Sequence, residues 1–430
     1  MELRKNTKKD GLLTAAALIL LFAVLLTMEL TMKSTSILFT VLKKGVIYAL
    51  VAVSMNLLNG FTGLFSLGQA GFMLIGAYTY AILTMPVAVK LSDSVYKYYD
   101  CAIGFELGIL PSLILAGLIA AFFAALIGLP VLRLKSDYLA IATLGFAEIL
   151  RAFFQWDAMG PVTNGANVMR QYKDLTKLRI PFTDIRFPPT LFCFLVSGVC
   201  IAIIVLLINS SYGRAFKAIR DDEIAAEAMG INLFKHKEIS FVISSFFAGI
   251  SGALLAMFQT TINATPFNTV MTYEILLIVV IGGIGSITGS IIGAFLFTAA
   301  SEWWLRGLDA GKWLGISASF MRPGFRKVVF AVLIMLIVLF YSRGIMGDKE
   351  FSWDKFITGL KNLPANLRSW PSRRKAKAAA KRDARAAKAA AKNRAKEAKA
   401  SNEARMASGE SLFTPLEVSD TVTVFDKEGK

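Results

Sequence analysis

The sequence has one histidine and three cysteines among its 430 residues. The histidine, His236, lies in a basic segment without a second imidazole, which argues against a histidine-based metal site or a catalytic triad. Cys101, Cys193 and Cys200 have neither metal-ligand nor redox spacing, and their odd number gives no disulfide framework. The Gly-x-x-x-x-Gly-Lys-Ser/Thr phosphate loop is missing too, so the chain does not hold ATP by that motif. We therefore expect no catalytic residue, no metal and no cofactor on this chain, and the sequence argues against an enzyme.

Charged residues are scarce as well, at 18% of the chain against 55% hydrophobic residues, and the mean hydropathy is +0.57. A soluble domain of this size does not carry so much apolar sequence with so little charge. Several stretches run for about 20 residues almost without charge, the length that crosses the ~30 Å hydrocarbon core of a bilayer. The cleanest, residues 12–32, is too long for a signal-peptide core and lacks a small-residue cleavage site, so we expect a retained helix. The composition predicts an all-α, polytopic membrane helix bundle.

Candidate membrane segments follow one another along most of the chain. They cover residues 11–32, 37–59, 65–88, 109–131, 137–156, 190–209, 239–260, 272–300 and 325–342. Lys43 and Lys44 interrupt the second segment, so we expect its membrane part to begin near Gly45. A glycine-rich run, which cannot form a stable helix interior, breaks the segment 272–300. Its glycines are Gly282, Gly283, Gly285 and Gly289. We predict two short helices folded back at this hinge, buried in protein or lining a cavity, and about 8–10 transmembrane segments in all.

Basic residues set the predicted orientation. Arg4, Lys5, Lys8 and Lys9 place the N-terminus in the cytoplasm by the positive-inside rule. Six crossings later the chain reaches the basic loop 210–238, which is then cytoplasmic as well. The loop 157–189 is also basic but falls outside on this count, which conflicts with the rule.

The end of the chain differs in composition, and we divide the protein into a transmembrane domain, residues 1–348, and a soluble tail, residues 349–430. Between Arg373 and Arg405 the tail carries 13 Lys and Arg against three acidic residues. Its Ala-, Lys- and Arg-rich sequence favours helix but has no apolar face to bury, so we expect a solvated helix or a disordered segment. Contact with anionic lipid is the alternative. A cytoplasmic tail requires that residues 272–300 cross the membrane an even number of times.

The loop 210–238 contains a segment, residues 213–230, that is too charged to span a membrane and too regular for a loop. Its alanines and its apolar side chains predict one amphipathic helix that stops at Gly230. The apolar residues are Ile219, Ile224 and Met229, and the acidic residues expected inside this helix are Asp221, Asp222, Glu223 and Glu227. Such a helix suits docking into a groove of another protein, and a membrane-surface helix is an equally good alternative.

Four segments of the chain form a recognisable series. They are Phe61-Thr-Gly-Leu-Phe-Ser-Leu-Gly-Gln-Ala-Gly71 with Gly76-Ala-Tyr78, Arg133-Leu-Lys-Ser-Asp-Tyr-Leu-Ala-Ile-Ala-Thr-Leu-Gly-Phe-Ala-Glu148, Glu223-Ile-Ala-Ala-Glu-Ala-Met-Gly-Ile231 and Ile281-Gly-Gly-Ile-Gly-Ser-Ile-Thr-Gly289. In order and spacing this series resembles the branched-chain amino acid permeases of the LivM type, over about residues 40–345. The third segment is similar to the coupling loop of ATP-binding-cassette importers. The chain departs from the family pattern at Ser136, often glycine there, and at Gln69, where many members have histidine. The tail has no counterpart.

The resemblance implies a non-enzymatic permease subunit in a prokaryotic cytoplasmic (inner) membrane, with both termini inside. The implied partners are a second homologous permease, two ATPase subunits that use the ATP, and a periplasmic or lipid-anchored binding protein. The implied substrates are branched-chain amino acids or related small amino acids and amides. The residues expected to couple to the ATPase are Gly213, Arg214, Ile219, Arg220, Glu223, Ala225, Ala226, Glu227 and Gly230.

Polar groups inside the predicted helices are candidates for the substrate pathway. Glu148 is unusual because a carboxylate at membrane depth faces protein or water, and Arg151 lies three residues on, the spacing of a same-face pair. A structural ion pair and a substrate role are both open for Glu148. The other candidates are Ser66, Gln69, Tyr78 and Thr143. Such groups also join membrane helices to one another. An ion-coupled secondary transporter of amino acids, with Glu148 as the ion site, is the alternative function.

Overall fold

The computed structural model describes residues 8–31, 36–91, 95–96, 98–134, 136–178, 187–305, 328–329, 332, 335 and 344–347. The chain divides into two units, Met1–Phe351 and Ser352–Lys430. The second unit, and with it nearly all of the predicted tail, lies outside the described residues, as does most of the predicted span 325–342.

The regular elements of the described residues are helices, apart from an isolated bridge between Met169 and Ile262. The backbone N–H and C=O groups of a helix bond to each other, which a membrane requires because lipid tails offer no hydrogen-bond partners. Six are long and apolar enough to cross a membrane. They are α1 (Lys8–Thr31), α2 (Ile37–Asn56, continued by the π-turn η1, Leu57–Thr62), α5 (Ile109–Val131), α6 (Ser136–Gln155), α8 (Pro189–Asn209) and α11 (Leu233–Gln259). The predicted all-α polytopic bundle is confirmed.

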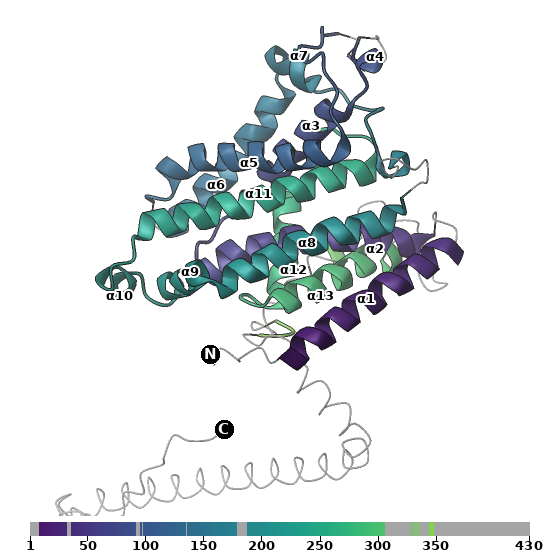
Figure 1. Ribbon diagram of the computed structural model, residues 1–430. Coiled ribbons are helices and arrows are strands. Elements are labelled where there is room, and N and C mark those ends of the chain that lie inside the picture. The colour runs from purple at the N-terminus through teal and green to yellow at the C-terminus, as the bar shows by residue number, and fades with distance from the viewer. Residues whose placement is uncertain are drawn as a thin grey trace, which may run out of the picture. The chain divides into compact units, whose positions relative to one another are not determined.

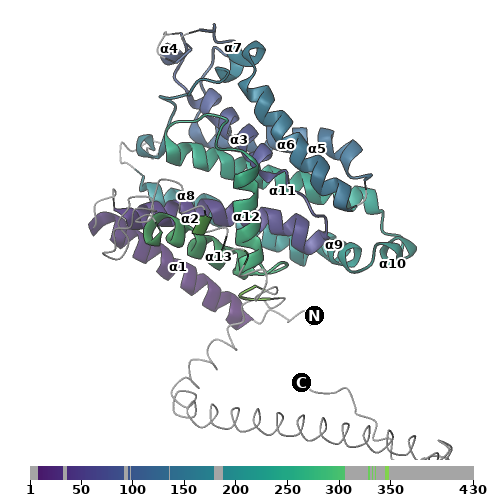
Figure 2. The same cartoon turned by 180° about the vertical axis from the view of Figure 1, so that it is seen from behind.

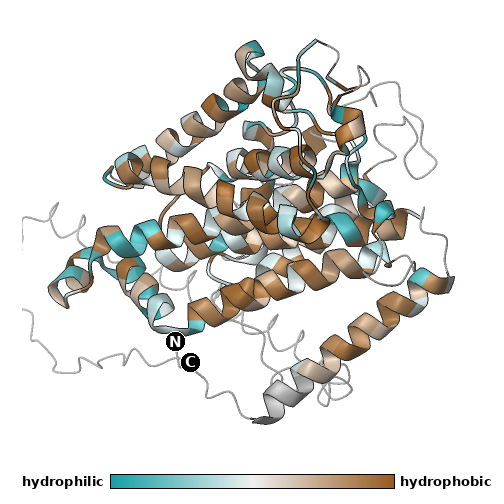
Figure 3. Ribbon diagram, turned by 45° about the horizontal axis from the view of Figure 1, so that its top comes forward, coloured by the Kyte–Doolittle hydropathy of each residue, from teal (hydrophilic) through white to brown (hydrophobic). Residues whose placement is uncertain are grey.

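The long helices lie side by side in the first unit. Figures 1 and 2 show α1, α8, α2 and α11 running along one direction, with α9 (Ser211–Asp221) and α10 (Glu223–Ala228) at one end. Figure 3 shows hydrophobic residues along these helices and more hydrophilic ones at their ends and connections. The short elements α4 (Val87–Lys90), η2 (Asp157–Met159), α7 (Gly160–Thr163) and η3 (Leu175–Lys177) belong to the connections.

One predicted span is shorter than expected. The span expected at 65–88 is the shorter α3 (Gln69–Thr84), because the chain turns at Gly63, with a φ of 78°, and stays non-helical up to Gly68. The span predicted from residue 37 begins there, as α2, and includes Lys43 and Lys44 within the helix. Lys44 forms an ion pair with Glu302 of η4 (Ala300–Trp304), so the carboxylate of Glu302 compensates the positive charge of Lys44.

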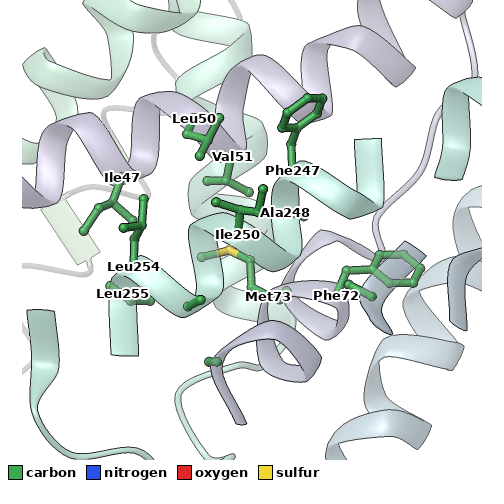
Figure 4. Packing of buried hydrophobic residues seen from close by; sticks show 14 of the residues in the cluster. Ile47, Leu50, Val51, Phe72, Met73, Phe247, Ala248, Ile250, Leu254 and Leu255 are labelled. Atoms are coloured by element: carbon green, nitrogen blue, oxygen red, sulfur yellow. The ribbon is translucent and has the colours of Figure 1, made fainter. Parts of the chain in front are cut away.

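The core lies where α11 contacts α2, α3 and α5. Figure 4 shows side chains of α2, α3 and α11 interlocking there, among them Leu50, Met73 and Leu254. The backbones of α3 and α11 come very close: a Cβ on Gly76 would lie 2.0 Å from the Gly249 carbonyl oxygen, and one on Gly252 would lie 2.0 Å from that of Met73. Small residues allow this packing, which holds helices together where burial from water contributes little.

The chain breaks between α12 (Thr269–Gly282) and α13 (Ile287–Ala299). Gly283 and Gly285 have φ values of 116° and 88°, a region open mainly to glycine. A Cβ on Gly282 would lie 2.4 Å from the Gly289 backbone, so the start of α13 packs directly on the end of α12. The chain therefore reverses direction at the glycine-rich run.

The segment 213–230 is not one helix. Asp222 is extended, with φ −160° and ψ 112°, and separates α9 from α10. Its carboxylate accepts hydrogen bonds from the backbone N–H groups of Ile224 and Ala225, at 2.9 and 3.1 Å, as an N-cap does. The acidic residues therefore surround a helix start rather than a helix interior. The expected stop is found, with Gly230 at φ 83° after α10.

Candidate functional site

The helix α9 packs on the ends of the long helices through one face. Gly213, Phe216 and Ile219 are its buried residues, at the three-residue spacing of a single helix face. A Cβ on Gly213 would lie 2.0 Å from the Ile208 carbonyl oxygen, so α9 begins in direct contact with the end of α8. These contacts fix α9 against the bundle.

Two large apolar side chains are uncovered at the short helix α10, Ile224 within it and Met229 at its C-cap. Ile224 is 82% exposed and Met229 is 83% exposed, whereas Ala226 between them is buried. Glu223, the first residue of α10, accepts a hydrogen bond from Lys237 of α11 at 2.7 Å. The caps and this ion pair thus hold α10 in place while it presents an apolar tip. The sequence pattern had grouped Ile219, Ile224 and Met229 in one amphipathic helix, whereas the break at Asp222 leaves Ile219 buried in α9 and the other two exposed.

The predicted coupling residues therefore divide into groups. Gly213, Ile219 and Ala226 are buried in the chain itself. Arg214, Ala225, Glu227 and Gly230 are exposed. Arg214 donates to the Ser211 hydroxyl at 2.9 Å. Arg220 turns toward α2, where its Nη1 donates to the Gly60 carbonyl at 3.1 Å. Figure 2 shows α9 lying near that end of α2.

Three of the predicted pathway residues, Ser66, Gln69 and Thr143, gather around the start of α3. All are buried. The Thr143 hydroxyl accepts from the Leu67 N–H at 3.0 Å and so ties α6 to the segment before α3. The Gln69 amide donates to the Ser244 hydroxyl of α11 at 2.8 Å, while its Oε1 has no hydrogen-bond partner among the described residues. These polar groups link helices, and one acceptor stays unused.

The other two predicted pathway residues, Tyr78 and Glu148, contact different side chains. The Tyr78 ring packs edge-on against Phe154, with centroids 5.0 Å apart. Arg151 Nε donates to Glu148 Oε2 at 2.7 Å, so the expected same-face pair is present. The other carboxylate oxygen accepts from both the N–H and the hydroxyl of Thr269, at 3.0 and 2.7 Å. Glu148 thereby joins α6 to the first residue of α12, a partner that no local pattern reveals.

A cavity of about 210 Å³ lies between α2, the end of α11 and the start of α12. It is lined by Tyr48, Leu255, Gln259, Pro266, Phe267, Asn268, Val270, Met271 and Glu274. None of the five predicted pathway residues lines it. Within the described part of the chain, no group of three His, Cys, Asp or Glu residues is placed to hold a metal.

Comparison with known proteins identifies relatives. Residues 37–341 match the family model described as "Branched-chain amino acid transport system / permease component". The high-affinity branched-chain amino acid transport system permease protein LivM of Salmonella typhimurium is 33% identical over 278 residues, which cover 60% of this chain and 61% of LivM. LivM of Escherichia coli gives the same values. LivH of Salmonella typhimurium is 23% identical over 313 residues, 71% of this chain and 93% of LivH. This chain thus spans about 61% of the length of the LivM proteins, and no solved structure matches it.

Proposed function

We propose a transport function from one premise: this chain belongs to the family of branched-chain amino acid transport system permease components. It is a multi-pass membrane protein with a transport role. In the proposal it forms half of the membrane pore of an ATP-driven importer in a prokaryotic cytoplasmic membrane. The substrates are branched-chain amino acids or related small amino acids and amides. The chain itself catalyses no reaction and binds no cofactor, because partner subunits bind and hydrolyse the ATP.

The observation that carries the proposal is the apolar tip of α10. Ile224 and Met229 are among the most exposed large apolar side chains described, yet they lie in and directly after a helix fixed by an N-cap and an ion pair. A rigid helix that offers apolar side chains is preorganised to enter a groove of a partner, since little entropy is lost on binding. We assign that groove to an ATPase subunit, one for this chain and one for the second permease.

The remaining features of the proposal follow from this docking. The α9–α10 end faces the cytoplasm, and both termini lie on that side. The binding protein docks on the opposite side and sets most of the specificity. ATP binding closes the pair of ATPases, α10 moves with them, and the pore changes its access from one side to the other. LivM and LivH of Salmonella typhimurium are both named as permease proteins of a high-affinity branched-chain amino acid transport system, which supports a pore of two homologous chains.

Glu148 does not favour the alternative of an ion-coupled carrier. Both of its oxygens accept hydrogen bonds, from Thr269 and from Arg151. A coupling carboxylate has to release such partners in each cycle, whereas a structural one keeps them.

Uptake into proteoliposomes tests the function. The chain, co-expressed with its partner permease, ATPases and binding protein, is expected to accumulate radiolabelled leucine only when ATP is present on the ATPase side. A catalytically inactive ATPase should abolish uptake, and a protonophore at constant ATP should leave it unchanged. Uptake that follows a proton gradient and ignores the inactive ATPase would disprove the proposal.

A further inference from the structure

The end of α2 lies between the cytoplasmic helix α9 and the turn that joins α12 to α13. There α2 widens into the π-turn η1, Leu57–Thr62, and ends at Gly63. Single π-turns within α-helices are rare and occur often at functional sites. The last carbonyls of a helix have no donor within it, so η1 offers acceptors to other elements.

Arg220 of α9 uses one of these acceptors. Its Nη1 donates to the Gly60 carbonyl at 3.1 Å, and its Nε and Nη2 donate to Asp221 Oδ1 at 3.1 and 2.9 Å. A Cβ on Gly63 would lie 3.0 Å from Arg220 Cγ, so the last turn of α9 also packs on the end of η1. A guanidinium at a helix C-terminus is further stabilised by the helix dipole. Arg220 is thus bound to the bundle through Gly60, while its side chain stays 37% exposed.

The other side of η1 holds the α12–α13 turn. Asn56, which is fully buried, accepts from the Gly285 N–H at 2.8 Å. Its amide donates to the Ser286 carbonyl at 2.9 Å and to the Ser290 hydroxyl at 2.8 Å. A Cβ on Gly60 would lie 1.9 Å from Asn56 Oδ1 and 2.5 Å from the Gly285 nitrogen, so no side chain fits between η1 and the turn.

The two contacts meet at Gly60 and Gly285. A Cβ on Gly285 would lie 3.5 Å from Arg220 Nη1 and 3.7 Å from the Gly60 oxygen. The guanidinium of the cytoplasmic helix therefore reaches the place where the turn rests on η1. The links in this series are hydrogen bonds and close contacts, and the tightest is between Gly60 and Gly285, so a displacement of α9 acts on the turn.

We propose that Arg220 is the positioning residue through which α9 and α10 move the α12–α13 turn, with η1 and Asn56 as the connection. This inference rests on the proposed function, because it takes the ATPases as the source of the movement. It assigns Arg220 an inward role instead of contact with the ATPase, and it makes the turn the first part of the transmembrane helices to respond to nucleotide.

The test follows the turn itself in the complete transporter. Ile284 in the turn is 48% exposed. An Ile284→Cys variant, in a background where the free cysteines Cys101, Cys193 and Cys200 are replaced, reports the turn through its rate of reaction with a maleimide. In reconstituted complexes a non-hydrolysable ATP analogue should change this rate by about fivefold or more, the lower end of typical couplings between sites. Arg220→Ala should reduce the change to less than about twofold and should lower the leucine imported per ATP hydrolysed by a similar factor.

Lys235→Ala removes an exposed positive charge from the same loop and serves as the matched control, with a wild-type response. A full nucleotide response in Arg220→Ala, or no response in a wild-type complex that imports leucine, would overturn the inference. If Arg220→Ala does not assemble, Arg220→Lys replaces it. Lysine has no planar fork and should show a clearly weakened response, so a full response there also counts against the inference. A wild-type complex that neither hydrolyses ATP nor imports leucine would instead refute the proposed function.

Discussion

We expect Glu148→Gln to lower the free energy of unfolding by about 1–2 kcal/mol, while transport per folded molecule changes little. Glutamine keeps one oxygen that accepts from Thr269, but its amide nitrogen then faces Arg151, donor against donor. Breaking a buried ion pair costs about 3–5 kcal/mol, and an exposed pair contributes about 0–1 kcal/mol. The side chains of Arg151 and Glu148 are 29% and 34% exposed, so the loss falls between these limits.

Two further variants separate the contacts of Glu148. Glu148→Ala also removes the acceptor for Thr269 and should cost about 2–4 kcal/mol, because charged acceptors contribute about 1.5–3 kcal/mol per hydrogen bond. Replacing Arg151 by glutamine in the Glu148→Gln protein should restore most of the loss, since no unpaired charge is left. Thermal unfolding of the purified protein in nanodiscs measures stability, and leucine uptake per folded molecule measures function. A Gln variant as stable as the wild type but without uptake would refute the structural assignment and point to an ion or substrate site.

Three more expectations follow from the structure and the sequence. Ile224→Asp together with Met229→Asp should leave membrane insertion intact but prevent co-purification with the ATPase. Uptake should fall more than tenfold, an effect of about 1.4 kcal/mol or more. Co-purification at wild-type strength would show that the two side chains do not dock on the ATPase. Glu238→Gln should raise the melting temperature by a few degrees, because both carboxylate oxygens of Glu238 are buried beside Gly128 without a hydrogen-bond partner among the described residues. A lower melting temperature would contradict this reasoning. Cysteines introduced at 305–315 should react with an impermeant thiol reagent added outside spheroplasts and a cysteine at Ala390 should not, and labelling at Ala390 would contradict the cytoplasmic tail.

The class of fold could be predicted from the sequence because lipid limits the possible structures. An apolar run of about 20 residues spans a membrane as an α-helix, whereas a glycine-rich run such as 282–289 does not form a stable helix there. The reversal between α12 and α13 follows from these two facts. The shorter α3 does not, because residues 63–68 are as apolar as the helix that follows and yet are non-helical, from Gly63 with its positive φ to Gly68.

The candidate site was harder to predict because its contacts join distant parts of the chain. Asp222 suits a helix interior or an N-cap about equally in sequence, and which it adopts decides where Ile224 and Met229 point. Arg220 belongs to a basic, solvent-rich segment, yet its partner Gly60 lies 160 residues earlier. The Glu148–Arg151 pair is local and predictable, whereas Thr269 is 121 residues away. Sequence patterns thus predict which residues share one face of a helix, but not which other helix or turn that face contacts.

The close approach of α3 and α11 restricts how the protein can move. With glycines where the two backbones meet at Gly76, Gly249 and Gly252, neither helix can slide or rotate past the other without a collision of main-chain atoms. We therefore expect α3 and α11 to travel as one rigid body during transport. The α12–α13 turn is held to the end of α2 by the hydrogen bonds of Asn56, so we expect it to move with that end of α2 and to leave the α3–α11 seam intact.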